Sequence, residues 1–415
     1  MFIMKHFKVV MLLAVLVCAG YPVIMFASWG SLTGYWQPID IYPAGNGDYW
    51  VSRVFAFETL LLISTNPTYK PSENQIALID SSGNTLWSLG GFAIPHSIEP
   101  LPTKTGTDLL VADCEHNQVL SIAYPSGTVL WRWQPSLINW TLVNPAWGPK
   151  YYYNNPTGPD WTHVNHAEWY NYTKWIGVLI SLRNWNLVVV VNYTAELSNP
   201  NQASNIVWWY GNYDNDSVLN HQHGATFDSN GNVWIADSDN QRVLAINYTT
   251  RTVFWSYQNS LGWVRGADPL PNGDVLISGT SKIIEVTPEK KVVWSYSSGI
   301  DNAYASIRLP NGDTVISNNY ALDILTVSPT GALVGSIGFP VGFFIPSFIA
   351  LPFLLLPLVW VAGSPKSTGG FHDRISRRFM MYLICVVCIM ILVTVFFQWI
   401  STFMEWIPGW PTSWK

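Results

Sequence analysis

The sequence predicts an all-β fold built from repeats, and three observations support this prediction. A phrase of β-runs separated by turns and ending in Trp recurs through the middle of the chain. Aromatic residues make up 15% of the 415 residues, and large flat side chains suit packed pleated sheets. Only 11% of the residues are charged, so part of the chain is expected to lie in lipid. These features indicate a six-bladed β-propeller with one N-terminal and two C-terminal transmembrane helices.

The recurring phrase defines the blades. Its six copies end at Trp87, Trp131, Trp208, Trp255, Trp294 and Val334. Most intervals between these positions are close to the roughly 40–45 residues of a four-stranded propeller blade. The longest interval holds an insertion at about residues 134–171. We expect an early strand near Phe55 to Ser64 to close the ring with the last blade, and the recurrent Trp to pack between adjacent blades.

Three apolar runs flank the repeats, at about residues 9–28, 339–362 and 379–403. The first is an anchor or a cleaved signal, and the other two are long enough to span a bilayer. The expected domains are therefore an anchor or signal at 1–30, an extracytoplasmic propeller at 31–338, and a membrane region at 339–415. This last region holds two transmembrane helices, a short basic cytoplasmic loop and an external tail.

Charge predicts how the chain is oriented in the cell membrane. Lysines precede the first apolar run and basic residues separate the last two, so both groups should face the cytoplasm and the propeller the outside. Five N-x-S/T sequons are possible glycan acceptors on that external surface. They are at Asn139, Asn171, Asn192, Asn215 and Asn247. The expected partners are the lipid bilayer and membrane proteins that contact the transmembrane helices.

Charge and cysteine content also exclude some functions. The net charge is -5 and the middle of the chain has no basic block, so nucleic acid is not an expected partner. Cys114 is the single cysteine of the middle region, which therefore has no internal disulfide. Cys385 and Cys388 form a C-x-x-C inside a hydrophobic run, where a metal or redox role is not expected.

Histidines recur in phase with the blades. The residue that enters the innermost strand of a blade lies at the mouth of the axial channel, where propellers bind ligands. Aligning the blade starts gives His96, His163, His223, Arg265 and Tyr304 at this position. Arg183, which follows a strand of blade three, could point into the same channel. Such a ring suits an oxyanion such as sulfate or phosphate, and a neutral histidine within it could act as a nucleophile. No short metal-ligand spacing such as H-E-x-x-H is present, so no metal is expected.

The same residues give the chain a family resemblance. The stretches HSIEPLP, HVNHAEW, LISLRNWN, IVWWYG and NHQHGATFDSNGNV occur in this order over about residues 75–335. In these stretches the chain resembles the arylsulfotransferase family, six-bladed propellers that move sulfuryl groups between phenols.

The resemblance implies a ping-pong mechanism without cofactor or metal. In it His223 takes the sulfuryl group from an aryl sulfate and passes it to a phenol or other hydroxyl acceptor. His96, His163 and Arg183 would bind the sulfuryl oxygens. His166 and His221 lie beside the matched residues, and they join Arg265 and Tyr304 as candidates for substrate binding.

Two alternatives remain open at the level of sequence. The propeller could be a non-catalytic scaffold or ligand-recognition subunit of a membrane protein complex, because fold alone does not determine function. It could also be a quinone-dependent dehydrogenase, whose repeats also end in Trp, but that family normally has eight blades and the sequence has six repeats. Convergence of the histidines in one pocket would favour the transferase.

Overall fold

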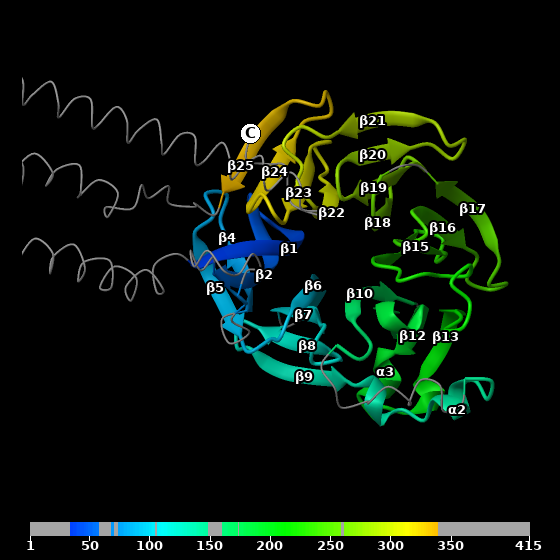
Figure 1. The fold of residues 1–415 in the computed structure, drawn as a ribbon. Helices are drawn as coiled ribbons and strands as arrows, with labels where there is room; N and C mark the ends of the chain where they lie inside the picture. Colours follow the sequence, from blue (N-terminus) through cyan, green and yellow to red (C-terminus); the bar gives the residue numbers. More distant parts are fainter. Residues whose placement is uncertain are drawn as a thin grey trace, which may run out of the picture. The chain divides into compact units, whose positions relative to one another are not determined.

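A computed structural model describes residues 34–57, 68–69, 74–103, 106–147, 160–172, 174–258 and 261–338. Residues 35–340 form one compact unit, in which six sheets surround a common axis (Figure 1). The prediction of an all-β, six-bladed propeller is therefore confirmed. The apolar runs expected to span the membrane lie outside the described residues. Among the described residues, no helix has the length and apolar character needed to cross a bilayer.

Each blade is an antiparallel sheet whose strands follow one another in sequence from the axis outward. Blade one contains β1 (Gly34–Gly45), β2 (Asp48–Phe57), β4 (Gln75–Ile79) and β5 (Thr85–Gly90), with β3 (Thr68–Tyr69) paired to β2. Blade two contains β6 (Pro95–Thr103), β7 (Gly106–Asp113), β8 (Gln118–Tyr124) and β9 (Thr128–Trp133). Blade three contains β10 (Val164–Asn171), β11 (Ile176–Leu182), β12 (Leu187–Asn192) and β13 (Ile206–Gly211).

The other three blades are shorter and more regular. Blade four contains β14 (Ala225–Phe227), β15 (Val233–Asp237), β16 (Arg242–Ile246) and β17 (Val253–Gln258). Blade five contains β18 (Val264–Pro269), β19 (Val275–Gly279), β20 (Ile283–Val286) and β21 (Val292–Tyr296). Blade six contains β22 (Ala303–Arg308), β23 (Thr314–Asn318), β24 (Asp323–Val327) and β25 (Leu333–Gly338).

The second strand of each of blades four to six is buried along its whole length. β15, β19 and β23 have no exposed residue, because neighbouring blades cover both faces of the sheet. Continuous apolar runs such as Val-Leu-Ile in β19 suit a strand that is covered on both faces. At least half of the residues are exposed in each of the outermost strands β17, β21 and β25. The core of the propeller therefore lies between the blades.

The recurrent Trp residues connect successive blades, which confirms their expected place. In blades one, three and four the indole Nε1 donates a hydrogen bond to a carbonyl in the outer turn of the next blade. The acceptors are Pro125 for Trp87, Tyr248 for Trp208 and Pro288 for Trp255, at 3.1, 2.8 and 2.8 Å. The same Trp therefore fills the space between two sheets and fixes their relative position.

In the described part of the chain, blade six forms four strands from residues 303–338. Of the early strand expected near residues 55–64, residues 55–57 belong to β2 of blade one, and residues 58–64 lie outside the described residues. Closure comes from apolar packing, in which Ile41 and Val51 of blade one share a buried cluster with Val315 of blade six.

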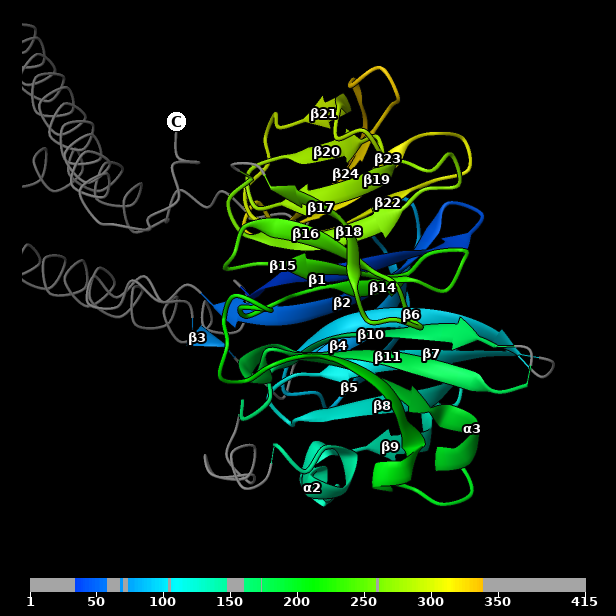
Figure 2. The same cartoon turned by 90° about the vertical axis from the view of Figure 1, so that its right-hand side faces the viewer.

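The insertion between blades two and three is shorter than expected. Residues 164–171 form β10, the innermost strand of blade three, so the end of the expected insertion belongs to the blade. Its described part holds η2 (Pro135–Leu137) and α2 (Trp140–Val143), and it packs by edge-on Trp contacts. Trp140 lies 5.0 Å from Trp185 of η4 (Arg183–Trp185), between ring centroids. Figure 2 shows α2 and α3 (Tyr193–Glu196) at the outer edge of the propeller beside β9.

Candidate active site on the propeller axis

A β-bulge in the innermost strand of several blades aims one side chain toward the axis. The register of these strands shifts at one residue, and a bulge of this kind re-aims the extra side chain. The bulged residues are His96 in β6, Asn165 in β10, Arg265 in β18 and Tyr304 in β22. His223 takes the same place in blade four, where its N–H and the carbonyl of Gly224 both bond to Ala236. The repeated bulge thus accounts for the regular recurrence, once per blade, of the residues that the sequence predicts at the axis.

The register in blade three differs from the expected one. Asn165, two residues beyond His163, is the bulged residue there. Asn165 donates its amide N–H to the carbonyl of Gln222 at 3.1 Å and so links blades three and four. His163 belongs to the loop that enters β10, yet its ring still reaches His96, with 5.7 Å between centroids.

Side chains from several blades meet at the axis. The ring of His96 lies 4.8 Å from that of His223 and 5.6 Å from that of Tyr304, between centroids. His223 and Tyr304 are 5.4 Å apart. The guanidinium carbon of Arg265 lies 4.5 Å from the centroid of the Tyr304 ring. The structure therefore brings His96, His163, His223, Arg265 and Tyr304 together, and we call this set the axial ring.

His96 and His223 are held neutral by their surroundings. Burial lowers the pKa of His223 well below its ordinary value, and the positive charge of Arg265 lowers it further. Burial, His163 and Arg265 act in the same direction on the pKa of His96. Both imidazoles are thus unprotonated at neutral pH, which leaves each with one donor and one acceptor nitrogen.

His223 has a defined orientation. Its Nδ1 lies 3.2 Å from the main-chain oxygen of Arg265, which can only accept, so Nδ1 carries the proton. Its Nε2 therefore holds a lone pair, and it is buried without a hydrogen-bond partner among the described residues. Nδ1 of His96 and Nε of Arg265 are likewise buried and without a partner in the described part of the chain. Unsatisfied polar atoms on one small surface are unusual inside proteins and indicate a place for a polar ligand.

The other predicted site residues lie around or outside the axial ring. His166 of β10 is half-buried, and its desolvation lowers its pKa to about 4; it also acts electrostatically on His223. Arg183 directs its guanidinium to Asn184, with Nη1 3.0 Å from Oδ1, and no described contact brings it to the ring. The guanidinium of the ring is that of Arg265.

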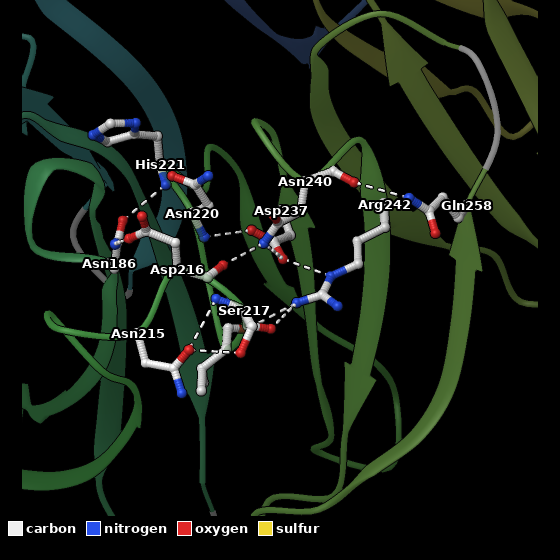
Figure 3. A network of polar contacts seen from close by, with 11 residues as sticks. Asn186, Asn215, Asp216, Ser217, Asn220, His221, Asp237, Asn240, Arg242 and Gln258 are labelled. Carbon is white, nitrogen blue, oxygen red and sulfur yellow. Dashed lines mark hydrogen bonds and ion pairs between the residues drawn. The ribbon is translucent and has the colours of Figure 1, made fainter.

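His221 lies apart from the ring, although it is only two residues from His223. Its imidazole is 41% exposed, and Nδ1 lies 2.7 Å from a carboxylate oxygen of Asp239. Figure 3 shows this imidazole at the edge of a polar network around Asp237. Asp237 accepts hydrogen bonds from the main chain of Asn220 and the side chain of Arg242, and so holds the turn that precedes His223.

A layer of carboxylates that the sequence analysis missed lies further along the innermost strands. Glu99, Glu168 and Asp268 each follow a bulged residue by three positions, and Asp40 of β1 joins them. Asp40 accepts the main-chain N–H of Ile98 at 2.9 Å, Glu99 that of Trp169 at 2.6 Å, and Glu168 that of Phe227 at 3.2 Å. Each of these three carboxylates thus satisfies an inward-facing N–H on the innermost strand of the next blade.

These carboxylates hold protons more strongly than usual. Burial raises the pKa of Asp40 and of Asp268 to about 7 and that of Glu168 to about 8. Burial and the neighbouring Glu168 raise the pKa of Glu99 as well. The innermost strands therefore carry a layer of imidazole and guanidinium groups and, three residues further along, a layer of carboxyls with raised pKa values.

The predicted glycan acceptors differ in exposure. Asn139, Asn171 and Asn215 are exposed, whereas Asn192 and Asn247 are half-buried. Asn192 caps α3, where its side-chain oxygen accepts the N–H of Ala195 at 3.0 Å. A glycan on any of the five stays a prediction.

The fold and the axial ring define a six-bladed β-propeller with a histidine-rich axial site. Residues 220–246, which include β14 to β16, match the family model of the NHL repeat. No curated protein matches the sequence.

The similar solved structures carry varied descriptions. A streptogramin B lyase shares 11% identity, with 74% of this chain and 88% of that chain covered and a TM-score of 0.47. A catalytically inactive virginiamycin B lyase from Staphylococcus aureus with quinupristin shares 10% identity over 74% and 85% of the two chains, with a TM-score of 0.46. The Cps50 (Swd1) propeller domain of Myceliophteria thermophila shares 12% identity over 74% and 89%, with a TM-score of 0.45.

Proposed function

We propose that the axial ring binds an oxyanion and transfers a sulfuryl group between hydroxyl compounds, with His223 as the nucleophile. One observation carries this proposal: a neutral imidazole is fixed by its Nδ1–H on the carbonyl of Arg265, and its Nε2 lies buried with no partner among the described residues. This is the form of histidine that nucleophilic catalysis requires. The resemblance of the surrounding sequence to arylsulfotransferases supports the choice of sulfur as the atom attacked.

The reaction takes two displacements at sulfur. The Nε2 lone pair of His223 attacks the sulfur of an aryl sulfate, the N–S bond forms, and the bond from sulfur to the phenolic oxygen breaks as the phenolate leaves. The proton on Nδ1 stays bonded to the carbonyl of Arg265 and stabilises the positive charge that the imidazole gains. An acceptor hydroxyl then attacks sulfur, its proton passes to the phenolate released in the first step, and the N–S bond breaks to restore neutral His223.

Arg265 and His96 are suited to bind the oxygens of the transferring group. The guanidinium is a planar multiple donor that matches oxyanions, and its Nε is buried without a partner in the described residues. The ring of His96 lies 4.8 Å from that of His223, so one small tetrahedral group could contact both. Donors placed where charge develops typically contribute about 3–4 kcal/mol to a transition state.

The test is transfer from 4-nitrophenyl sulfate to a phenol by the purified full chain in detergent. We expect turnover in the wild type, loss of at least about a thousandfold in His223→Ala, and near wild-type turnover in His221→Ala. His221 is a matched control, since it is two residues away and bonds to Asp239 outside the ring. Equal turnover in wild type and His223→Ala would contradict the proposal.

The propeller is proposed to work outside the cell, anchored in the membrane by the apolar runs at its ends. Positive charges at the edges of these runs support this orientation. Protease added to intact cells should cleave within residues 31–338. Protection in intact cells, followed by cleavage after permeabilisation, would place the propeller inside.

A second candidate function, a scaffold for membrane proteins, has one observation in its favour. The outermost strand of every blade exposes an apolar residue directly before the position of the recurrent Trp, which is Val334 in blade six. These residues are Leu86, Leu130, Val207, Phe254, Val293 and Leu333, each between 40% and 54% exposed. If the full chain shows no turnover with any aryl sulfate, and if Phe254→Ser releases a co-purifying membrane protein, the scaffold is the better account.

A further inference from the structure

Three side chains of types that bind metals meet at the junction of blades two and three. The proposed sulfuryl transfer uses none of them as a metal ligand. They are Cys114, Asp160 and His163, whose ligand atoms all lie within 4.8 Å of one another. The Cys114 Sγ is 3.5 Å from Oδ1 of Asp160, and Nδ1 of His163 is 2.6 Å from the same oxygen. We propose that this cluster binds one transition-metal ion of the zinc class, a function that goes beyond sulfuryl transfer.

The polypeptide holds the three residues from both sides. Cys114 lies in the turn between β7 and β8, where its N–H donates to the carbonyl of Ile94 at 2.8 Å. The loop of Asp160 and His163 is fixed to this turn by Asn117, whose side-chain oxygen accepts the N–H of Thr162 at 2.7 Å. On the other side, the amide of Asn184 donates to the carbonyl of Asp160 at 2.8 Å. The cluster is thus pre-ordered before any ligand arrives.

The backbone of this loop is in an unusual conformation. Asp160 and His163 both have positive φ values, 59° and 49°. Left-handed backbone at residues other than glycine costs of the order of 1 kcal/mol each and is found where surrounding structure enforces it, often at functional sites. Here the left-handed backbone interrupts the extended path that leads into β10. Both side chains therefore face Cys114.

The donor set selects a zinc-class ion. A thiolate, an imidazole and a carboxylate suit Zn²⁺, whereas Mg²⁺ and Ca²⁺ prefer oxygen ligands alone. Bonds of about 2.0–2.3 Å in a tetrahedral site place ligand atoms about 3.3–3.5 Å apart. The separation of Sγ and Oδ1 already fits. The hydrogen bond between His163 and Asp160 must widen by less than about 1 Å, which the 45% exposed side chain of Asp160 allows.

The surrounding charges favour a cation overall. The carboxylates of Asp160, Glu115 and Asp113 all act on the Cys114 sulfur. Arg183 lies near enough to act on Asp160 and opposes binding. Three protein ligands leave the fourth position of a tetrahedral ion open. Because His163 belongs to the axial ring, an ion on its Nδ1 would also fix the orientation of this imidazole next to His96.

The experiment uses Co²⁺ as a spectroscopic probe of the metal-stripped full chain. Cys18, Cys385 and Cys388 are first changed to Ala, so that Cys114 is the single thiol. We expect one Co²⁺ per chain, with a thiolate-to-cobalt charge-transfer band, and displacement by Zn²⁺. Cys114→Ser should abolish the band, and Asp160→Asn should weaken binding by at least about tenfold.

His116→Ala is the matched control, because this histidine lies in the same turn but bonds to Asp113. It should keep the band and the affinity. If Cys114→Ser does not fold, Asp160→Asn gives an independent result, since that side chain is half exposed. The absence of a charge-transfer band, or affinity unchanged in Asp160→Asn, would overturn the metal site. Sulfuryl transfer is measured separately, so the two proposals fail independently.

Discussion

At the scale of single residues, local environment separates histidines that look alike in the sequence. His221 and His223 are two positions apart, yet His221 is exposed and bonds to Asp239, whereas His223 is buried against Arg265. The backbone accounts for the difference, since His221 has a positive φ of 46° and turns away from the axis. Sequence alone could select both residues, but it could not rank them.

The lowered pKa of His223 predicts the pH dependence of the reaction. A lowered pKa means that the neutral, nucleophilic form persists below the ordinary histidine value of 6.5, so kcat/KM should stay constant as the pH falls past 6.5. Arg265→Gln removes a positive charge that lowers this pKa but keeps the main-chain carbonyl. The acid limb of kcat/KM should therefore move up toward 6.5 in this variant. An acid limb at 6.5 in the wild type would contradict the assigned environment.

The metal-ligating cluster could not be predicted from residue patterns in the sequence. Cys114 lies in blade two, and Asp160 and His163 follow the insertion, so no short motif contains all three. The sequence predicts no metal, because it contains no short spacing of metal ligands. The contact depends on a turn and a loop that meet through Asn117, which the spacing of the residues does not indicate.

At the scale of elements, most of the site residues that could be predicted from the sequence belong to the innermost strands. Because blades repeat, one position per blade points to the axis, and the structure has His96, His223, Arg265 and Tyr304 at this position. Blade three departs from the expected alignment, since the bulge falls on Asn165 and the entering loop is longer. Continuing the same alignment by three residues would have found Glu99 and Asp268, but not Glu168, because blade three is out of register with that alignment.

The carboxylate layer predicts how stability depends on pH. The pKa of Glu168 is raised to about 8, so its contribution to stability is complete below about 4.5 and is lost as the pH rises through about 8. Glu168→Gln stays neutral and can still accept the N–H of Phe227. At pH 9 it should stabilise the folded state by about 2 kcal/mol, or raise Tm by about 4 °C, with little change at about pH 5.

Glu289→Gln is the control for this measurement, because that side chain is exposed. It should leave Tm within about 1 °C of the wild type at both pH values. A Glu168→Gln variant that is less stable than the wild type at about pH 9 would show that the ionised carboxylate is favourable in the channel.

The inter-blade Trp residues predict a second effect at this scale. Trp208 is 2% exposed and donates to the carbonyl of Tyr248 in blade four. Trp208→Ala should reduce the free energy of unfolding by about 3–5 kcal/mol, because it leaves a cavity between two sheets. Val207→Ala, at the adjacent exposed position, should change it by less than about 0.5 kcal/mol. Chemical denaturation of both variants tests the difference, and equal effects would contradict the assigned role.

At the scale of the whole molecule, the repeat predicted the number of blades but not how the ring closes. The count follows from turns and Trp positions that recur along the chain. Closure depends on long-range packing between blade one and blade six, with the amide of Asn319 donating to the carbonyl of Pro38 at 2.9 Å. These residues are far apart in the sequence, and nothing in their local pattern indicates the contact.

The arrangement of the propeller concentrates reactive groups at one end of its axis. Its innermost strands and the loops that enter them bring histidines, an arginine and a tyrosine from separate parts of the chain to one buried site, while the carboxylates below join the same strands by hydrogen bonds. The ring of sheets therefore pre-organises the site, which is the condition for strong electrostatic stabilisation of a transferring group.

Sulfuryl transfer through His223 is tested most directly by trapping the covalent intermediate. The full chain is incubated with an aryl sulfate labelled at sulfur, without acceptor, then quenched at alkaline pH and mapped by peptide mass spectrometry. We expect one sulfuryl group on the imidazole of His223, released when a phenol is added. A labelled wild-type protein that carries the group on any other residue, or turnover with direct transfer and no labelled protein, would contradict it.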